Sequence, residues 1–261
     1  MNADEIVAAV GRGVKNALLT NQHFLGAEQG RIRNADIRPE YLMTVKLAEE
    51  LAAVDHVVEP EASMKKLRDH ARALACFKAL GKKDKALEAA VREALNQKNY
   101  DYGKERIDIL VLGSSVLEPP LLLVETKLGV KNADGVIKDI DRVVKLLGMY
   151  NKAGLLDKHH VYGAVVFHAM EEQGTATSLE ELAAEILRRI ATHLAFLRPH
   201  HPALIFKAGL LSNSLIQESA SAFEEDHGDG TSEMIFARDQ FAFQAGLVLI
   251  GNAPDVISVR F

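Results

Sequence analysis

Cysteine is almost absent from this sequence, with Cys76 as the single example among 261 residues. An internal disulfide framework is therefore excluded, and the composition fits a protein of the reducing cytoplasm. Long apolar runs are missing too: no run of about 18 residues occurs, so no membrane-spanning helix is expected. Asp4, Glu5 and Arg12 interrupt the first segment, which lacks the layout of a secretory signal peptide.

An excess of basic charge is also missing, because 31 Lys and Arg face 36 Asp and Glu, giving a formal net charge of −5. This balance argues against a protein that coats nucleic acid through bulk positive charge. It remains compatible with an enzyme that acts on nucleic acid, because a metal site needs a local acidic cluster and backbone contacts need only a local basic rim. The length suits one large α/β domain.

Apolar periodicity divides the chain into helical and extended segments. Helices are expected at 3–20, 39–54, 61–80, 84–97, 136–150 and 178–197. Strands are expected at 106–112, 121–128, 161–167, 203–211, 241–250 and 256–261, and a mobile loop at 217–232. The order strand, strand, helix, strand between 106 and 167 predicts an α/β fold with a mixed central sheet flanked by helices.

Ionisable residues interrupt two of these apolar strands. Glu125-Thr126-Lys127 is the only acidic-x-lysine triplet of the chain, and it lies within the apolar run 121–128. Side chains two apart on a strand share a face, so Glu125 and Lys127 are expected side by side. Asp108 lies between two isoleucines on the preceding strand. If the two strands pair as a hairpin, both carboxylates can converge on Mg²⁺ or Mn²⁺, which prefer oxygen ligands.

A simpler alternative is a solvated strand edge, on which Asp108 forms a surface ion pair with Arg106 or Lys104. Against this alternative, the residues around Glu125 are apolar at both odd and even positions, which favours a strand buried on both faces. Buried charges are costly to desolvate and therefore call for a functional reason. We thus favour an active site at these residues.

The residues Ile107-Asp108-Ile109 and Leu121-Leu-Leu-Val-Glu125-Thr126-Lys127 together resemble the signature of the PD-(D/E)XK nuclease superfamily, or restriction-endonuclease-like fold. Residue 107 is isoleucine where the signature has proline. The resemblance covers about 36–168. It implies a single nuclease-like domain over 1–261, with a helical N-terminal extension at 1–35 and a C-terminal embellishment at 169–261.

The resemblance also implies roles for individual residues. Asp108 and Glu125 would hold the metal, with the carbonyl of Thr126 as a further ligand and Glu40 contributing directly or through water. Lys127 would orient the nucleophile and offset developing charge instead of acting as a free base, because an ammonium between carboxylates stays protonated. An alternative for Glu40 is a favourable first-turn charge interacting with the dipole of its helix.

Basic residues follow the motif on the helix expected at 136–150. Lys138 and Arg142 are four apart and can contact phosphates beside the cleft, as similar helices do in the superfamily. The alternative is a surface ion pair between Asp139 and Arg142, which contributes little to stability.

The sequence therefore predicts a Mg²⁺- or Mn²⁺-dependent nuclease acting on DNA in preference to RNA, in genome defence or DNA processing. It predicts no membrane partner. Two kinds of protein partner are compatible with this function. One is a second copy of the chain (a homodimer), with the helices at 3–20 and 178–197 as interface candidates, and the other is a partner protein for targeting. The alternatives are a catalytically silent nuclease-fold module that binds nucleic acid or a protein, and an unrelated metalloenzyme or structural α/β protein.

Overall fold

The computed structural model describes residues 1–27, 39–53, 56–96, 100, 102–113, 115, 117–172, 176–211, 215–226 and 232–261. Its helices are α1 (Ala3–Ala27), α2 (Pro39–Ala52), α3 (Met64–Gly81), α4 (Lys85–Ala94), α5 (Asp134–Lys152), α6 (Ala176–Leu197) and α7 (Asp255–Ser258), with the 3-10 turn η1 (Arg198–His200). Its strands are β1 (Val57–Ser63), β2 (Arg106–Leu112), β3 (Leu122–Val130), β4 (Tyr162–Glu172), β5 (Ile205–Leu210), β6 (Leu215–Asp226) and β7 (Ser232–Gly251).

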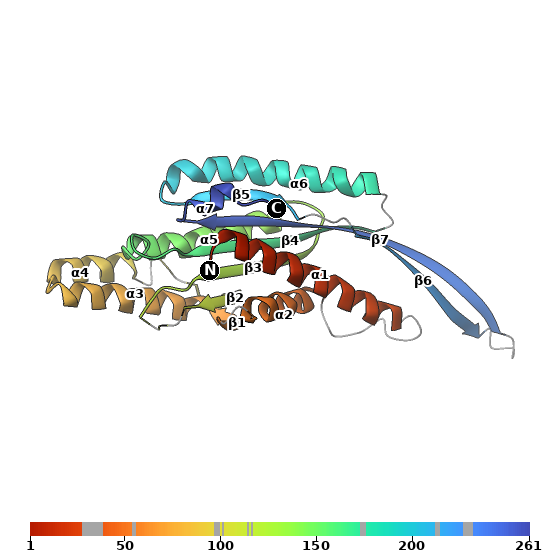
Figure 1. Cartoon of the computed structure of the whole chain (residues 1–261), viewed down its shortest axis with the longest axis horizontal. Coiled ribbons are helices and arrows are strands. Elements are labelled where there is room, and N and C mark those ends of the chain that lie inside the picture. Colours follow the sequence, from red (N-terminus) through yellow and green to blue (C-terminus); the bar gives the residue numbers. More distant parts are fainter. Residues whose placement is uncertain are drawn as a thin grey trace.

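The described strands form one mixed sheet in the order β1-β2-β3-β4-β7-β5, and β6 pairs with β7. β3 and β4 run parallel, whereas the other described neighbours are antiparallel. α5 forms the crossover between the two parallel strands, which a short turn cannot join. The predicted α/β layout with a mixed sheet is confirmed, and the strands that carry Asp108 and Glu125 are direct neighbours (Figure 1).

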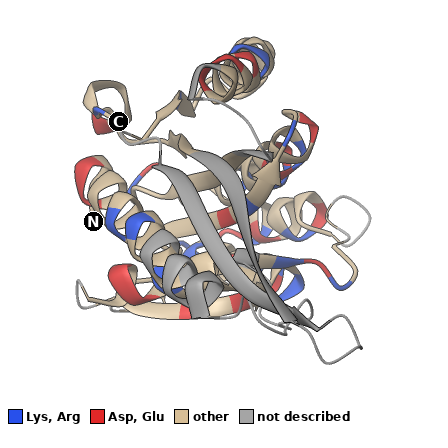
Figure 2. Cartoon of the chain, turned by 90° about the vertical axis from the view of Figure 1, so that its right-hand side faces the viewer, with Lys and Arg blue, Asp and Glu red and all other residues tan. Residues whose placement is uncertain are grey.

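Helices cover both faces of the sheet (Figure 1). The core on one face includes Leu123 of β3 and Ile140 of α5, together with residues of α3 and α6. The core on the other face includes Leu122 of β3, Ile6 of α1 and Leu47 of α2. Neighbouring residues of β3 thus enter opposite cores, as the period of two in a strand requires. Acidic and basic residues are interspersed over the described helices (Figure 2).

α5 lies close to the strands that carry the acidic residues. Its apolar stripe is fully buried and consists of Val136, Ile140, Val143 and Leu147, at the spacing of one helix face. Gly163 on β4 permits the close approach, because a Cβ there would lie 2.2 Å from Cγ1 of Val143. The packing places Asp139 and Arg142 of the same helix beside β3.

Three sequence-based expectations are wrong. Residues 57–63 form the edge strand β1, whereas a helix was expected to begin at 61; Pro60 and its acidic neighbours hide the strand pattern and are typical of edges. The expected strand 256–261 contains the short helix α7, which follows Pro254, whose φ of −63° already suits a helix. The expected loop 217–232 contains most of β6 and the start of β7, which pair along their length; residues 227–231 lie outside the described part.

The region beyond residue 168 takes part in the same sheet. β7 lies between β4 and β5, and its register with β4 runs from Glu172–Phe241 to Tyr162–Gly251. Among the described residues, no helix is both long enough and apolar enough to cross a membrane. In the described sheet, β1 is the edge strand on the side of the candidate site, and β5 and β6 pair with different parts of β7 on the other side.

Candidate active site between β2 and β3

The site begins where the β2–β3 ladder ends. The ladder pairs Val111 with Leu122 and finishes at Ile109 with Val124. One step further in the same register, Asp108 faces Glu125. There the backbone N–H of Thr126 donates to Oδ2 of Asp108 at 2.7 Å instead of to a strand carbonyl. The carboxylate thus occupies the place where the two strands part.

β2 rolls about its own axis at Asp108. Ile107 packs in the core with α3 and α5, whereas Ile109, two residues on, packs in the core with α1 and α2. Residues two apart in a regular strand share a face. On β1, Glu61 lies between the pairs that join Pro60 to Ile109 and Ala62 to Ile107, and its φ is +54°. A left-handed φ is uncommon for a residue other than glycine, and it accompanies the irregularity beside Asp108.

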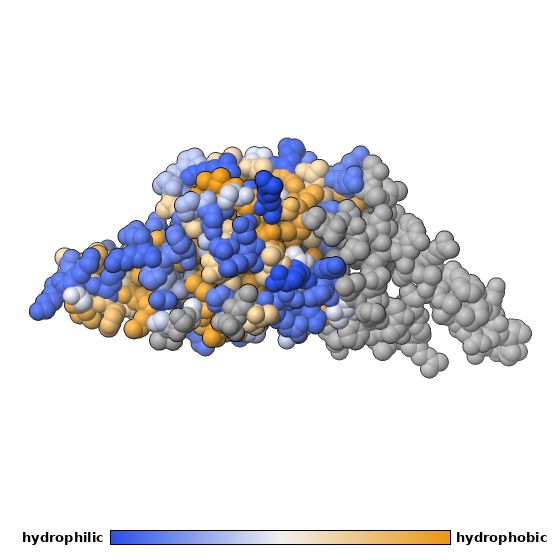
Figure 3. All heavy atoms as spheres, in the orientation of Figure 1, coloured by the Kyte–Doolittle hydropathy of each residue, from blue (hydrophilic) through white to orange (hydrophobic). Residues whose placement is uncertain are grey.

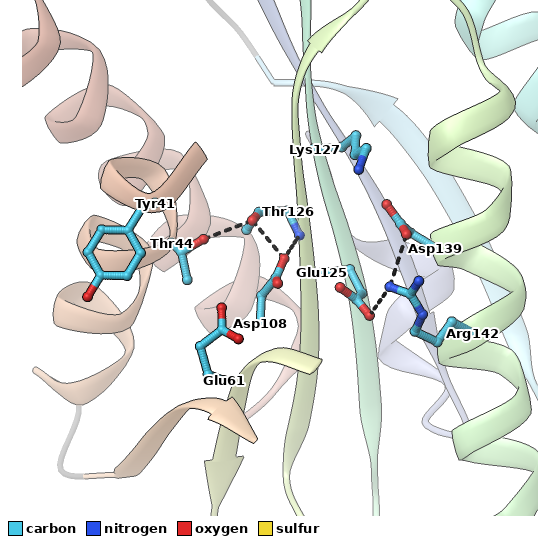
Figure 4. A pocket seen from close by; sticks show the side chains of 9 residues that line it. All are labelled: Tyr41, Thr44, Glu61, Asp108, Glu125, Thr126, Lys127, Asp139 and Arg142. Carbon is cyan, nitrogen blue, oxygen red and sulfur yellow. Dashed lines mark hydrogen bonds and ion pairs between the residues drawn. The ribbon is translucent and has the colours of Figure 1, made fainter. Parts of the chain in front are cut away.

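A chain of hydroxyl groups holds the Asp108 carboxylate. Oγ1 of Thr126 donates to Oδ2 of Asp108 at 2.8 Å, so the same oxygen accepts both Thr126 hydrogen bonds. Oγ1 of Thr44 on α2 lies 2.9 Å from Oγ1 of Thr126. Because the Thr126 proton is given to Asp108, Thr44 is the donor in this contact. The chain ties β2, β3 and α2 together and leaves Oδ1 of Asp108 directed to the cavity (Figure 4).

Glu125 is the most deeply buried carboxylate of the site, with only 2% of its surface exposed. Arg142 donates to its Oε1 at 2.9 Å and to Oδ1 of Asp139 at 3.2 Å. Burial raises the pKa of Glu125 to about 8; the charge of Asp108 adds to the rise and the hydrogen bond from Arg142 opposes it. A divalent cation bound between Glu125 and Asp108 would favour the charged form of this carboxylate.

Lys127 lies half-buried two residues beyond Glu125. Its amine points toward Asp139 in Figure 4. The stem of Lys127 runs along the first turn of α5, where a Cβ at Gly135 would lie 3.3 Å from its Cε. Gly135 in the first turn of the helix thus leaves room for the lysine, and Lys127 lines the cavity of the site.

One cavity of about 310 Å³ joins these groups, and its lining comes from α2, three strands and α5 (Figure 4). The lining residues are Tyr41, Thr44, Glu61, Asp108, Glu125, Thr126, Lys127, Asp139 and Arg142. Four carboxylates therefore share the cavity with two cationic side chains. The structure brings the sequence-predicted Asp108, Glu125, Thr126 and Lys127 together here, and it adds Arg142, which was expected to contact phosphate.

Other predicted residues lie elsewhere. Glu40 belongs to the first turn of α2, but its side chain lies outside the described residues. Lys138 is exposed on α5 and does not line the cavity. Arg142 pairs with Asp139 as one alternative expected, yet the pair is not a surface pair, since Asp139 is only 5% exposed.

Sequence reasoning missed Asp139 and Glu61. A signal for Asp139 exists, because it lies three residues after Val136 and four before Val143 and so interrupts the buried stripe of α5. Glu61 has no comparable signal, since nothing in the sequence separates it from Glu59 on the same strand. Its place in the lining follows from the pairing of β1 with β2.

The oxygen donors of the cavity suit a hard divalent metal. Within the described ranges, no three Asp, Glu, His or Cys side chains form a cluster that could hold a metal ion by themselves. Mg²⁺ does not require one, because it retains several waters and is commonly held by one or two carboxylates and the substrate. Asp108 and Glu125, with the carbonyl of Thr126, supply oxygen donors of this kind, so the residues present fit Mg²⁺ or Mn²⁺.

Comparisons with protein-family models, with curated proteins and with solved structures found no match to this chain.

Proposed function

We propose that this chain is a metal-dependent nuclease of the restriction-endonuclease-like fold that hydrolyses phosphodiester bonds, with DNA as the favoured substrate. One observation carries the proposal: Asp108, Glu125 and Lys127, which come from two adjacent strands, line a single cavity. Supporting it, the cavity is rich in carboxylates, and burial together with the charge of Asp108 raises the pKa of Glu125. A buried negative site of this kind gains most from a divalent cation.

Asp108 and Glu125 would hold the metal, with the carbonyl of Thr126 as a further donor. When bound, Mg²⁺ or Mn²⁺ supplies Lewis-acid polarisation of the phosphate and a lower pKa for coordinated water. The two hydrogen bonds from Thr126 fix Oδ2 of Asp108 and orient the carboxylate. Preorganised ligands of this kind avoid the cost of reordering the site during the reaction.

Lys127 and Arg142 would act on the substrate side. Lys127 shares a strand face with Glu125, so its ammonium can orient the attacking water and offset charge that develops on the phosphate. Arg142 lies half-buried at the wall of the cavity and presents a planar guanidinium, the group best matched to phosphate oxygens. Both would hold the phosphodiester in place while the bond to the leaving oxygen breaks.

A second candidate function is a catalytically silent module that kept the fold to bind nucleic acid or a protein. The Arg142–Glu125 ion pair favours it, because the arginine already neutralises the buried carboxylate without any metal. In that case the cavity would be a structural ion-pair cluster, and cleavage would be absent with every metal.

Cleavage assays separate the two candidates. Supercoiled plasmid and end-labelled DNA and RNA oligonucleotides are incubated with the protein and Mg²⁺, Mn²⁺ or EDTA. The proposal expects metal-dependent cutting that Lys127→Ala and Asp108→Asn reduce at least 100-fold. Lys131→Ala, which removes an exposed lysine just after β3, is the matched control and should cut normally. A Lys127→Ala protein as active as the wild type would refute the assignment, and inactivity of the wild type in all metals would favour the silent module.

A further inference from the structure

A second, larger hollow lies along the outer side of α5. It has a volume of about 730 Å³ and lies between Tyr100 on one side and the end of α6 with η1 on the other. Its charged and titratable lining consists of Lys145, Lys152, His200, His201 and Asp141. Asp141 is engaged with His193, whose Nε2 lies 2.7 Å from Oδ1 of Asp141. We call this hollow the α5 groove; its lining is basic although the whole chain is acidic.

The α5 groove and the candidate active site share one face of a helix. Lys138, Arg142, Lys145 and Lys152 follow one another at intervals of four, three and seven residues. At 3.6 residues per turn they fall within an arc of about 80°. Arg142 reaches the active-site cavity, and Lys145 and Lys152 line the groove. Arg142 and Lys152 are separated by about 15 Å along the helix axis.

Aromatic rings hold the groove lysines in position. Nζ of Lys145 lies 4.7 Å from the centre of the Tyr102 ring, and Nζ of Lys152 lies 5.5 Å from the centre of the Tyr100 ring. Within the described part of the chain, neither lysine forms a salt bridge with a carboxylate. A cation over an aromatic face keeps its charge available to an incoming anion, while its mobility is reduced. The two ammonium groups are therefore preset for an anionic ligand.

Two adjacent histidines, His200 and His201, line the far end of the groove beside Lys152. Burial lowers the pKa of His201, and the neighbouring His200 and Lys152 lower it further. Lys152 is therefore close enough to act on His201 as a positive charge. On the face seen in Figure 3, hydrophilic side chains lie near the ends of α5 and α6, with some apolar side chains between them. Two lysines held by aromatic rings, with Asp141 as the one carboxylate among the described residues of the lining, suit the groove to a polyanion.

We propose that the α5 groove binds the phosphodiester backbone of a nucleic-acid strand and leads that strand to the active site at Arg142. The proposal rests on the proposed function only for the cutting step, since the groove binds through its own lysines. At about 3.4 Å per nucleotide, the separation of Arg142 and Lys152 corresponds to roughly four nucleotides. Substrates should therefore need at least that length on one side of the cleaved bond.

The test is a double variant, Lys145→Gln with Lys152→Gln, in the full chain. Lys82→Gln with Lys83→Gln is the matched control, because it removes two exposed lysines between α3 and α4. Fluorescence anisotropy in EDTA measures binding of labelled 20-nucleotide single-stranded DNA, duplex DNA and single-stranded RNA. We expect the groove variant to bind at least tenfold more weakly at low salt, and the control to stay within twofold of the wild type. The slope of log affinity against log salt should shrink by about 1.4 to 1.8 for two lost phosphate contacts.

Hydrolysis of bis(4-nitrophenyl) phosphate and of the 20-nucleotide DNA separates this proposal from the nuclease assignment. The groove variant should hydrolyse the small diester at the wild-type rate, because this substrate is too short to extend from the active site to the groove. Its rate of oligonucleotide hydrolysis should fall at least tenfold. Weaker binding by the groove variant, together with no cleavage by the wild type, would support nucleic-acid binding by the α5 groove and refute the nuclease function. Wild-type affinity in the groove variant, or no binding of any oligonucleotide by the wild type, would overturn the groove.

Discussion

Arg142 on α5 donates a 2.9 Å hydrogen bond to Glu125 on β3, although Glu125 is only 2% exposed. The same guanidinium nitrogen reaches Asp139 at 3.2 Å. One arginine thus serves two buried carboxylates, and removing one partner of such a group leaves uncompensated charge. The pair makes α5 part of the site. A metal that binds Glu125 would have to compete with the guanidinium of Arg142.

Replacement of Arg142 by glutamine should strengthen metal binding and weaken cleavage. A neighbouring positive charge repels a divalent ion about twice as strongly as it repels a proton, so its loss helps the metal more than it helps the competing proton. We expect Mn²⁺ to bind several-fold more tightly in Arg142→Gln by isothermal titration calorimetry, while cleavage falls at least tenfold. Lys85→Gln removes one positive charge from an exposed residue of α4 and should change neither Mn²⁺ affinity nor the cleavage rate by more than twofold. Weaker Mn²⁺ binding in Arg142→Gln would mean that the arginine organises the site instead of competing for it.

The hydroxyl of Thr126 should matter for metal binding as well as for stability. Thr126→Val removes one of the two hydrogen bonds to Asp108 and the acceptor of Thr44, at a cost of about 1–3 kcal/mol. Thr126→Ser keeps the hydroxyl and should recover most of the loss, measured by urea unfolding and by Mn²⁺ titration. Because Thr44 acts through Thr126, Thr44→Val should cost much less in the Thr126→Val background than in the wild type. Additive effects would contradict the hydroxyl chain.

Two buried tyrosines should respond oppositely to loss of their hydroxyl groups. Tyr162 on β4 donates to Asp255, which also accepts from the backbone N–H of Ala3 at the start of α1. Tyr162→Phe should therefore cost about 1.5–3 kcal/mol, the range for hydrogen bonds to charged groups. The hydroxyl of Tyr150 has no partner among the described residues, so Tyr150→Phe should be neutral or stabilising. Chemical denaturation measures the free energy of unfolding of both variants. Equal losses of stability in the two variants would contradict this prediction.

His168 should make the fold sensitive to acid. It is 2% exposed on β4, and burial lowers its pKa from 6.5 to about 4. Between these values the unfolded chain binds more protons than the folded one, so stability falls as the pH drops from about 6.5 to 4, by at most about 1.4 kcal/mol per pH unit. His168→Gln should be less stable than the wild type at pH 8, and the difference should shrink at pH 5. A pH-independent difference in the free energy of unfolding would show that His168 does not titrate in this window.

Local patterns in the sequence were sufficient for the central elements. The strand expected at 106–112 matches β2, and the helix expected at 136–150 lies within α5. Both segments have a single dominant period, which local side-chain geometry translates directly into structure. The edge strand β1 was missed because Pro60 and its acidic neighbours break that period, and its strand character comes from pairing with β2.

The sequence by itself determined which ionisable residues would interrupt the two apolar strands, because a charge within such a run stands out without any coordinates. Only the tertiary structure decided what surrounds them. The gap between β2 and β3 that holds Asp108 depends on where a ladder ends, and the approach of Arg142 depends on how α5 packs on the sheet. Partners of this kind are far apart in the chain, so no local pattern records them. Long-range packing alone brings them into contact.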